Sequence, residues 1–153
     1  MATIVVGIDG SEGAEAALRF ALEEARLRRA TLRVVHAYVL PLSDVAPDPF
    51  LLEFPSGPGP ELEAIAADLD KGARGLIDAA LERVLGGSEA GVPLERVAIE
   101  GSPAASLIGE AEGADLLVVG SRGHGRVHGL LLGSVSQQCV SHAPCPVAIV
   151  PQR

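Results

Sequence analysis

Apolar residues in this chain follow two patterns that alternate from the first residues to the last. Short continuous runs, rich in β-branched residues, are typical of strands buried on both faces of a parallel sheet. Longer stretches carry apolar residues at helical spacing. The runs predict strands at Ile4–Ile8, Leu32–Val39, Val92–Ile99, Leu116–Val119 and Val147–Val150.

The helical stretches lie between these runs. They cover about residues 12–29, 60–85, 103–113 and 133–142. Ser11 and Ser102 precede two of them and are suited to be N-caps, while Pro60 and Pro103 fit a first helical turn. We therefore expect four helices alternating with five strands.

This alternation predicts an α/β fold, an open five-stranded parallel sheet with helices on both faces. The length of 153 residues fits a single domain, 1–153. Ligands of such sheets bind outside the carboxyl ends of the strands, where the strand order reverses. The residues at those ends are Asp9, Ala37, Gly101 and a loop that begins at Gly120.

Residues 40–60 form a Pro-rich insertion with a composition of its own. It holds six of the 11 prolines, together with Phe50 and Phe54. A connection of this length is uncommon unless it has a function. The segment is either a lid over a ligand site or a solvated connector anchored by its phenylalanines.

Charge is distributed unevenly. The net charge is −8, yet no Asp or Glu follows Asp115, and Leu116–Arg153 contains three arginines and three histidines. The locally positive charge favours a small anion near the loop that begins at Gly120, which is rich in glycine. The negative net charge argues against nucleic-acid or anionic-membrane partners. With no long apolar run and no signal-peptide pattern, we expect a cytoplasmic protein in which Cys139 and Cys145 stay reduced.

The loop after the fourth predicted strand is the main candidate site. It leads from a strand into a helix, where backbone amides can converge on phosphate. It contains neither a P-loop nor a dinucleotide fingerprint, and the chain has no GxSxG motif or metal-ligand cluster. It does fit G-x2-G-x9-G-[ST], with glycines at 120, 123 and 133 and Ser134 after them.

At these residues the chain resembles the universal stress protein family, in its ATP-binding branch. The resemblance covers the whole chain and implies a Rossmann-like, adenine nucleotide alpha-hydrolase-like fold with strand order 3-2-1-4-5. It rests on Val6-Gly7-Ile8-Asp9-Gly10-Ser11, Val35-His36-Ala37, Gly101-Ser102-Pro103, Gly120-Ser121-Arg122-Gly123, Leu132-Gly133-Ser134-Val135-Ser136 and Cys145-Pro146-Val147.

The resemblance implies an ATP site, with Mg²⁺ accompanying the phosphates. Asp9 is expected to contact the ribose or the metal, and the backbone of Ala37 to read the adenine edge. Gly120 and Gly123 would let the loop approach the ribose and phosphates, and the start of the last helix would hold the polyphosphate. The implied residues are Ile8, Asp9, Ala37, Gly101, Gly120, Ser121, Arg122, Gly123, His124, Gly125, Gly133, Ser134, Val135 and Ser136.

Several of these residues have a second interpretation. Asp9 and Ser134 also suit plain helix starts. The four basic residues Arg122, His124, Arg126 and His128 either contact phosphate or are solvated loop charges. His36 lies inside a buried strand run and is interpreted as a hydrogen-bonded core histidine, not a ligand.

Two functions follow as hypotheses. The first is a nucleotide-dependent stress-response or signalling module that is at most a slow ATPase, because no general base with an orienting partner is visible near the loop. The alternative is a homodimeric interaction or chaperone-like module in which the nucleotide is incidental. The resemblance implies a dimer that pairs the strand Val147–Val150, whose exposed apolar edge needs cover.

Overall fold

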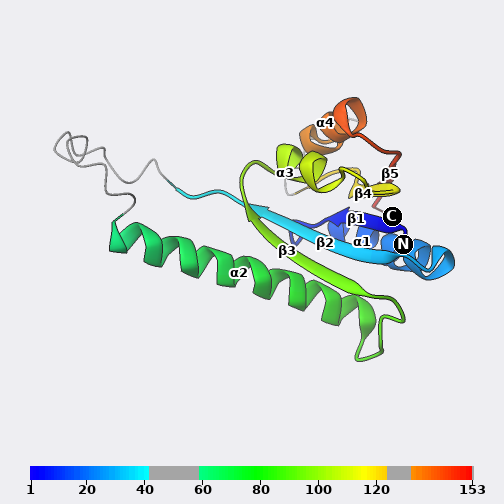
Figure 1. Ribbon diagram of the computed structural model, residues 1–153, viewed down its shortest axis with the longest axis horizontal. Helices are drawn as coiled ribbons and strands as arrows, with labels where there is room; N and C mark the ends of the chain where they lie inside the picture. Colours follow the sequence, from blue (N-terminus) through cyan, green and yellow to red (C-terminus); the bar gives the residue numbers. More distant parts are fainter. Residues whose placement is uncertain (42–58, 124–131, 153) are drawn as a thin grey trace.

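The computed structural model describes residues 1–41, 59–123 and 132–152, which form one five-stranded parallel sheet with helices on both faces (Figure 1). The strand order is β3-β2-β1-β4-β5, so the predicted fold class is confirmed. The elements are β1 (Thr3–Gly7), α1 (Glu12–Arg28), β2 (Thr31–Tyr38), α2 (Pro60–Leu85), β3 (Leu94–Glu100), α3 (Pro103–Glu110), β4 (Leu116–Gly120), α4 (Ser134–His142) and β5 (Val147–Val150).

Alternate residues of each central strand enter two separate cores. In β1, Ile4 and Val6 pack with the buried residues of α1 and α2, whereas Val5 packs on the opposite face with Leu107 and Cys139. A residue period of two along a strand produces this division. The sheet is thus buried on both faces, as the continuous apolar runs predicted.

The helix starts follow their predicted capping signals. Ser11 is the N-cap of α1, and its hydroxyl accepts a hydrogen bond from the Ala14 amide. Ser102 occupies the N-cap position of α3, but its side chain makes no capping bond. Proline stands in the first turn of both α2 and α3, where the missing N–H costs nothing.

Some predicted boundaries were wrong by one to three residues. Helix α1 ends at Arg28 because Arg29 adopts a left-handed conformation, with φ of 54°. Helix α3 ends at Glu110, ahead of Gly113, and α4 begins at Ser134 because Gly133 is its extended N-cap. β2 starts one residue earlier than predicted and β3 starts two residues later, at Leu94.

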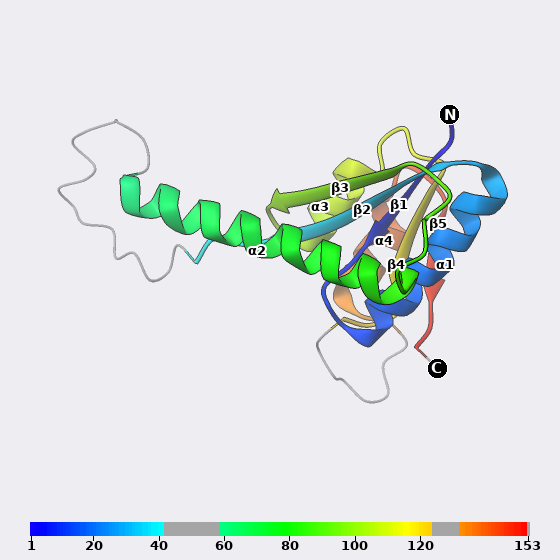
Figure 2. The same cartoon turned by 90° about the horizontal axis from the view of Figure 1, so that it is seen from below.

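Helix α2 is longer than the sheet it covers. Its buried residues begin at Ala73, so the first turns, from Pro60 onward, carry no buried side chain. Figures 1 and 2 both show this end of α2 extending beyond the strands. The predicted insertion 40–60 precedes this end, and most of it, residues 42–58, lies outside the described residues.

Cys139 and Cys145 are not joined in a disulfide. Cys139 is buried beneath the sheet, and this burial raises the pKa of its thiol, so the reactive thiolate form is disfavoured. Cys145 is half-buried. Within the described ranges, none of the helices combines the length and the apolar character needed to cross a membrane.

Candidate functional site

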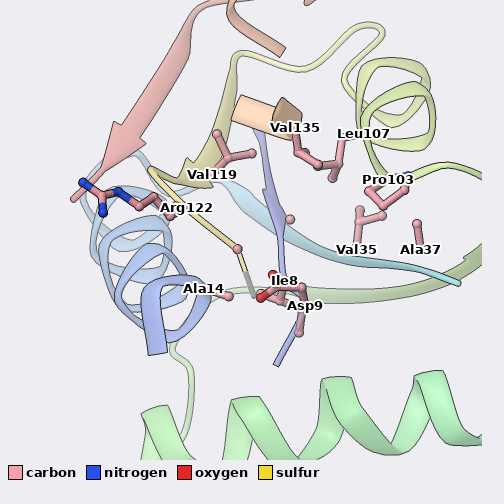
Figure 3. Close-up of a pocket in the computed structure, with 13 residues that line it drawn as sticks. Ile8, Asp9, Ala14, Val35, Ala37, Pro103, Leu107, Val119, Arg122 and Val135 are labelled. Carbon is pink, nitrogen blue, oxygen red and sulfur yellow. The ribbon is translucent and has the colours of Figure 1, made fainter. Parts of the chain in front are cut away.

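A cavity of about 110 Å³ lies at the carboxyl ends of the central strands (Figure 3). The chain runs outward from β1 to β2 and β3, and then returns to β4 on the other side of β1. The strand order therefore reverses at β1, the place where open α/β sheets bind ligands. The lining residues are Gly7, Ile8, Asp9, Ala14, Val35, Ala37, Pro103, Leu107, Val119, Gly120, Arg122, Gly123 and Val135.

The turn between β1 and α1 supplies the carboxylate of the site. Asp9 Oδ1 accepts hydrogen bonds from the amide of Ser11 at 3.0 Å and from its hydroxyl at 2.5 Å. The same hydroxyl caps α1 through the Ala14 amide. Residues 8–11, which we call the β1–α1 corner, therefore tie the orientation of the Asp9 carboxylate to the start of the helix.

The other carboxylate oxygen of Asp9 lies against the glycine-rich loop. A Cβ atom added to Gly123 would stand 2.6 Å from Asp9 Oδ2. Any side chain at position 123 would therefore displace the carboxylate. The absence of a side chain at Gly123 is what allows the loop backbone and Asp9 to meet.

One wall of the cavity is apolar. Pro103 and Leu107 come from α3, Val119 from β4 and Val135 from α4. Leu107 packs so closely on the end of β1 that a Cβ on Gly7 would lie 2.6 Å from its Cδ1. This wall, opposite a carboxylate, suits a ligand that is apolar and flat at one end and rich in hydroxyl groups at the other.

Strand β2 contributes alternate residues to the cavity. Val35 and Ala37 line it, whereas His36, between them, does not. The Nδ1 atom of His36 lies 2.8 Å from the Ile8 carbonyl oxygen. The predicted hydrogen bond of His36 is therefore confirmed, but its side chain is half-buried and not part of the core, so that part of the prediction was wrong.

The connection from β4 to α4 is closed at its base by the Gly133 amide and by the Ser136 hydroxyl, whose one hydrogen is shared between two carbonyl oxygens; we call these contacts the loop neck. The Gly133 amide donates to the Ser121 carbonyl at 2.8 Å. The buried hydroxyl of Ser136 lies 3.1 Å from that same carbonyl and 2.9 Å from the Gly133 carbonyl. The loop neck brings the two described ends of the connection together, and the Ser121 amide also donates to Val150 in β5.

The base of the connection also approaches α1, backbone to backbone. A Cβ on Gly120 would lie 3.0 Å from the Gly13 carbonyl oxygen, and a Cβ on Gly13 would lie 3.0 Å from the Arg122 carbonyl oxygen. These distances are tighter than ordinary side-chain contacts. Glycine at both positions is what permits the approach.

The structure brings half of the predicted site residues together around the cavity. Those that line it are Ile8, Asp9, Ala37, Gly120, Arg122, Gly123 and Val135. Five others do not line it: Gly101, which follows β3, and Ser121, Gly133, Ser134 and Ser136, around the loop neck. His124 and Gly125, with Arg126 and His128, lie outside the described residues.

Six lining residues were missed by the sequence analysis. They are Gly7, Ala14, Val35, Pro103, Leu107 and Val119. Val35 lies two residues before Ala37, so the alternation of side chains along a strand indicated that both face the same side. Val119 lies one residue before Gly120, and alternation gave no such signal for it. Leu107 follows Pro103 by one helical turn, and that spacing indicated a shared helix face without saying that the face borders a ligand site.

Arg122 and Asp9 are the charged residues among those that line the cavity in the described part of the chain. In Figure 3 the Arg122 side chain extends away from Asp9 and from the apolar wall. The described ranges contain no group of three or more potential metal-ligating side chains. A metal ion here would therefore need most of its ligands from a bound molecule.

An ion-pair network links the first turn of α1 to α2. Glu15 accepts hydrogen bonds from Arg19 at 2.8 Å and from Arg83 at 3.2 Å. The Arg19 hydrogen bond, with that of Arg83, lowers the pKa of the Glu15 carboxyl against the opposing effect of burial. Both arginines are about half exposed, so the network adds little to stability.

Comparison with known proteins places this geometry in context. The model of the universal stress protein family matches residues 1–151. A universal stress protein of Thermus aquaticus is 37% identical over 97% of this chain and 97% of its own length. A universal stress protein of Mycobacterium tuberculosis is 42% identical over 96% of this chain, which spans about half of that relative, 46%.

Solved structures of similar fold include two described with nucleotides. A universal stress protein in complex with cAMP is 27% identical, with a TM-score of 0.59 over 97% of this chain and 95% of that one. The universal stress protein of Archaeoglobus fulgidus in complex with dAMP is 25% identical, with a TM-score of 0.56 over 98% of both chains.

Proposed function

The chain belongs to the universal stress protein family, and we propose that it binds ATP with Mg²⁺ at the cavity between β1, β2 and β4. In this proposal it acts in the cytoplasm as a nucleotide-dependent stress-response or signalling module. Relatives of similar fold are described with cAMP and with dAMP, which supports an adenine nucleotide as the ligand class.

The observation that carries the proposal is the contact between the Asp9 carboxylate and Gly123. The Asp9 Oδ2 atom lies beside backbone that a ligand can approach closely, which supports a role for it as a hydrogen-bond acceptor for ribose hydroxyls. The apolar wall of Pro103, Leu107 and Val135 suits the face of a base. Because small-molecule pockets usually measure about 300–1,000 Å³, the cavity of about 110 Å³ fits only part of ATP.

The phosphates would lie toward the start of α4. Ser134 is exposed in its first turn, and the N–H groups of a helix start carry partial positive charge. Asp9 is the carboxylate that lines the cavity in the described part of the chain, and it would contact a metal that arrives with the phosphates. Mg²⁺ would supply charge neutralisation to the phosphate oxygens.

Binding and conformational signalling are favoured over rapid hydrolysis. Asp9 is the single carboxylate that lines the cavity in the described part of the chain, and its Oδ1 already accepts two hydrogen bonds from Ser11. A general base must be able to take a proton from the attacking water. We therefore propose at most slow ATPase activity.

The test is calorimetric titration with ATP, with and without Mg²⁺, after the purified protein has been analysed for bound nucleotide. Asp9→Ala is expected to weaken ATP binding roughly tenfold or more, because a hydrogen bond to a charged group contributes about 1.5–3 kcal/mol. Asp9→Asn keeps a hydrogen-bond acceptor for Ser11 and removes the negative charge. It therefore separates the hydrogen bonds of Asp9 with Ser11 from its contact with the nucleotide.

Gly133→Ala is the second variant. Its added Cβ would come no closer than 3.5 Å to any neighbour, so the variant is expected to fold while it crowds the phosphate region. Wild-type protein that fails to bind at millimolar ATP would overturn the proposed function. Unchanged affinity in both Asp9→Ala and Gly133→Ala would overturn the site assignment.

The homodimer is a second candidate, favoured by the exposed edge of the sheet. β5 is the last strand of the sheet, and beside it lies a groove of about 420 Å³ lined by Ala16, Phe20, Ala148, Ile149, Val150 and Pro151. An unpaired strand edge next to an apolar groove tends to pair with another chain. We propose that a second copy of the chain covers it, forming an interaction module.

Sedimentation tests the dimer. Phe20→Glu, in the groove, is expected to shift the protein toward monomer, whereas Leu27→Glu is not, because Leu27 is 79% exposed on the same helix and does not line the groove. A wild-type monomer at micromolar concentration would exclude the dimer and leave the nucleotide proposal intact.

A further inference from the structure

We propose that His36 is a positioning residue for the nucleotide site, holding the β1–α1 corner in place through the Ile8 carbonyl. The inference rests on the proposed function for its effect on ligand binding. It rests on geometry alone for its effect on the corner. His36 lies in β2 and does not line the cavity, so it acts through Ile8 and Asp9.

The hydrogen bond fixes which nitrogen of His36 carries hydrogen. A carbonyl oxygen only accepts, so at 2.8 Å from the Ile8 oxygen the Nδ1 atom must donate. The Nε2 atom takes no part in the contact. The relevant chemical group is therefore one N–H at the Nδ1 position of the side chain.

Both backbone polar groups of Ile8 are bound to β2. The Ile8 amide donates to the Val35 carbonyl at 2.9 Å, and the Ile8 carbonyl accepts from His36. Ile8 follows the last residue of β1, where the chain begins to turn toward α1. The imidazole thus replaces a backbone donor where the strand ends.

The hydrogen bond from His36 to Ile8 lies one residue away from the Asp9 carboxylate, which faces the cavity. Asp9 follows Ile8 directly, and its carboxylate is held on one side by Ser11 and contacts Gly123 on the other. A shift of the Ile8 peptide would move the Asp9 backbone and change where Oδ2 points. His36 supports the corner from β2 without occupying ligand space.

Side-chain alternation gives His36 this role. Its neighbours Val35 and Ala37 line the cavity, so His36 projects from the other face of β2, where it is half-buried. Val35 and Ala37 therefore line the cavity, while His36, between them, restrains the β1–α1 corner. A half-buried carbonyl without its donor would lose part of its hydrogen-bond free energy.

Two amide variants separate the hydrogen bond from mere packing. The amide nitrogen of Asn stands near the position of histidine Nδ1, and that of Gln near Nε2. His36→Asn is therefore expected to keep the donor to Ile8, while His36→Gln and His36→Leu lose it. All three are first checked by circular dichroism and thermal unfolding.

Binding is measured by ATP calorimetry. His36→Gln and His36→Leu are expected to weaken ATP binding about fivefold, the equivalent of one neutral hydrogen bond, and His36→Asn is expected to bind like wild type. If His36→Asn lost as much affinity for ATP as His36→Gln, the proposal would be overturned, because a side chain that only fills space would not be replaced better by Asn than by Gln. Wild-type affinity in all three would overturn it as well.

Hydrogen exchange of the nucleotide-free protein gives a readout independent of binding. Amides of residues 10–14 are expected to exchange faster in His36→Gln than in His36→Asn, with the amides of α2 as an internal control. If wild-type protein binds no ATP, the proposed function fails, and exchange still decides the positioning role. Equal exchange in the Asn and Gln variants would reject that role.

Discussion

Two connections flank the cavity, and they are held in different ways. The β1–α1 corner, residues 8–11, is restrained by the side chains of His36, Asp9 and Ser11. The connection from β4 to α4, residues 121–133, is restrained in its described part by backbone contacts and by Ser136 at the loop neck. The first connection presents a carboxylate, and the second presents backbone that a ligand can approach.

The difference shows how one site combines a carboxylate held by side-chain hydrogen bonds with a stretch of backbone held at its ends. Each side-chain hydrogen bond in the corner limits the direction in which Asp9 can point. The loop neck instead fixes where a longer connection starts and ends. We therefore expect substitutions that change the orientation of Asp9 to change ligand affinity, and substitutions that remove a loop-neck hydrogen bond to change stability first.

The largest expected effects come from the glycines at the ends of the two central strands. Gly120→Ala is expected to cost roughly 3 kcal/mol of unfolding free energy, since its Cβ meets the Gly13 backbone, which cannot rotate away. Gly7→Ala is expected to cost about 1–2 kcal/mol, because its Cβ meets the movable end of Leu107. Urea denaturation measures both.

Leu107→Val distinguishes the two glycines, because it shortens the side chain that Gly7→Ala would strike. In a double-mutant cycle it is expected to reduce the cost of Gly7→Ala by at least about 0.5 kcal/mol and to leave that of Gly120→Ala unchanged. Gly75→Ala, in α2 with nothing within 4 Å, is the control and is expected to stabilise the helix. Equal coupling at both glycines would contradict this explanation.

The next effect separates two serines of α4. Ser136→Ala is expected to lower stability by about 1 kcal/mol, since it removes a buried hydroxyl from the loop neck. Ser134→Ala, at an exposed position, is expected to leave stability unchanged and to weaken ATP binding. Thermal unfolding and calorimetry on the same samples test both. The reverse assignment, with Ser136 affecting affinity alone, would break the distinction between anchoring and ligand contact.

An effect of the same size comes from a comparison of two helix caps. Ser11→Ala is expected to cost about 1 kcal/mol, because its hydroxyl caps the Ala14 amide and also donates to Asp9. Ser102→Ala is the matched control and is expected to cost almost nothing, because Ser102 stands at an N-cap without a capping bond. Equal costs in denaturant titrations would mean that the corner gains nothing from its side-chain bonds.

The sequence predicted the fold because its signals are local. β-branched runs, helical spacing and N-cap residues such as Ser11 act within one element, and each indicated the correct element. Arg29 ended α1 without a glycine or proline to mark it, since its left-handed conformation is uncommon for a residue with a side chain.

The site was only partly predictable because its contacts join distant segments. Gly123 was expected in the site, but its contact with Asp9 depends on how the residues after β4 lie against the turn after β1. Ser136 was predicted to hold phosphate. Its buried hydroxyl is engaged with the Ser121 and Gly133 carbonyls, and the direction of a hydroxyl group follows from tertiary packing and not from the residue type.

The paired approach of Gly13 and Gly120 has a consequence for how this sequence can change. Gly120 makes room for the Gly13 backbone in α1, and Gly13 makes room for the Arg122 backbone just after β4, so the nearest atoms on both sides are backbone. A substitution at either position cannot be compensated by trimming a neighbour, because backbone cannot be trimmed. We therefore expect a mutational library to show few tolerated substitutions at Gly13 or Gly120, even though Gly13 does not line the cavity.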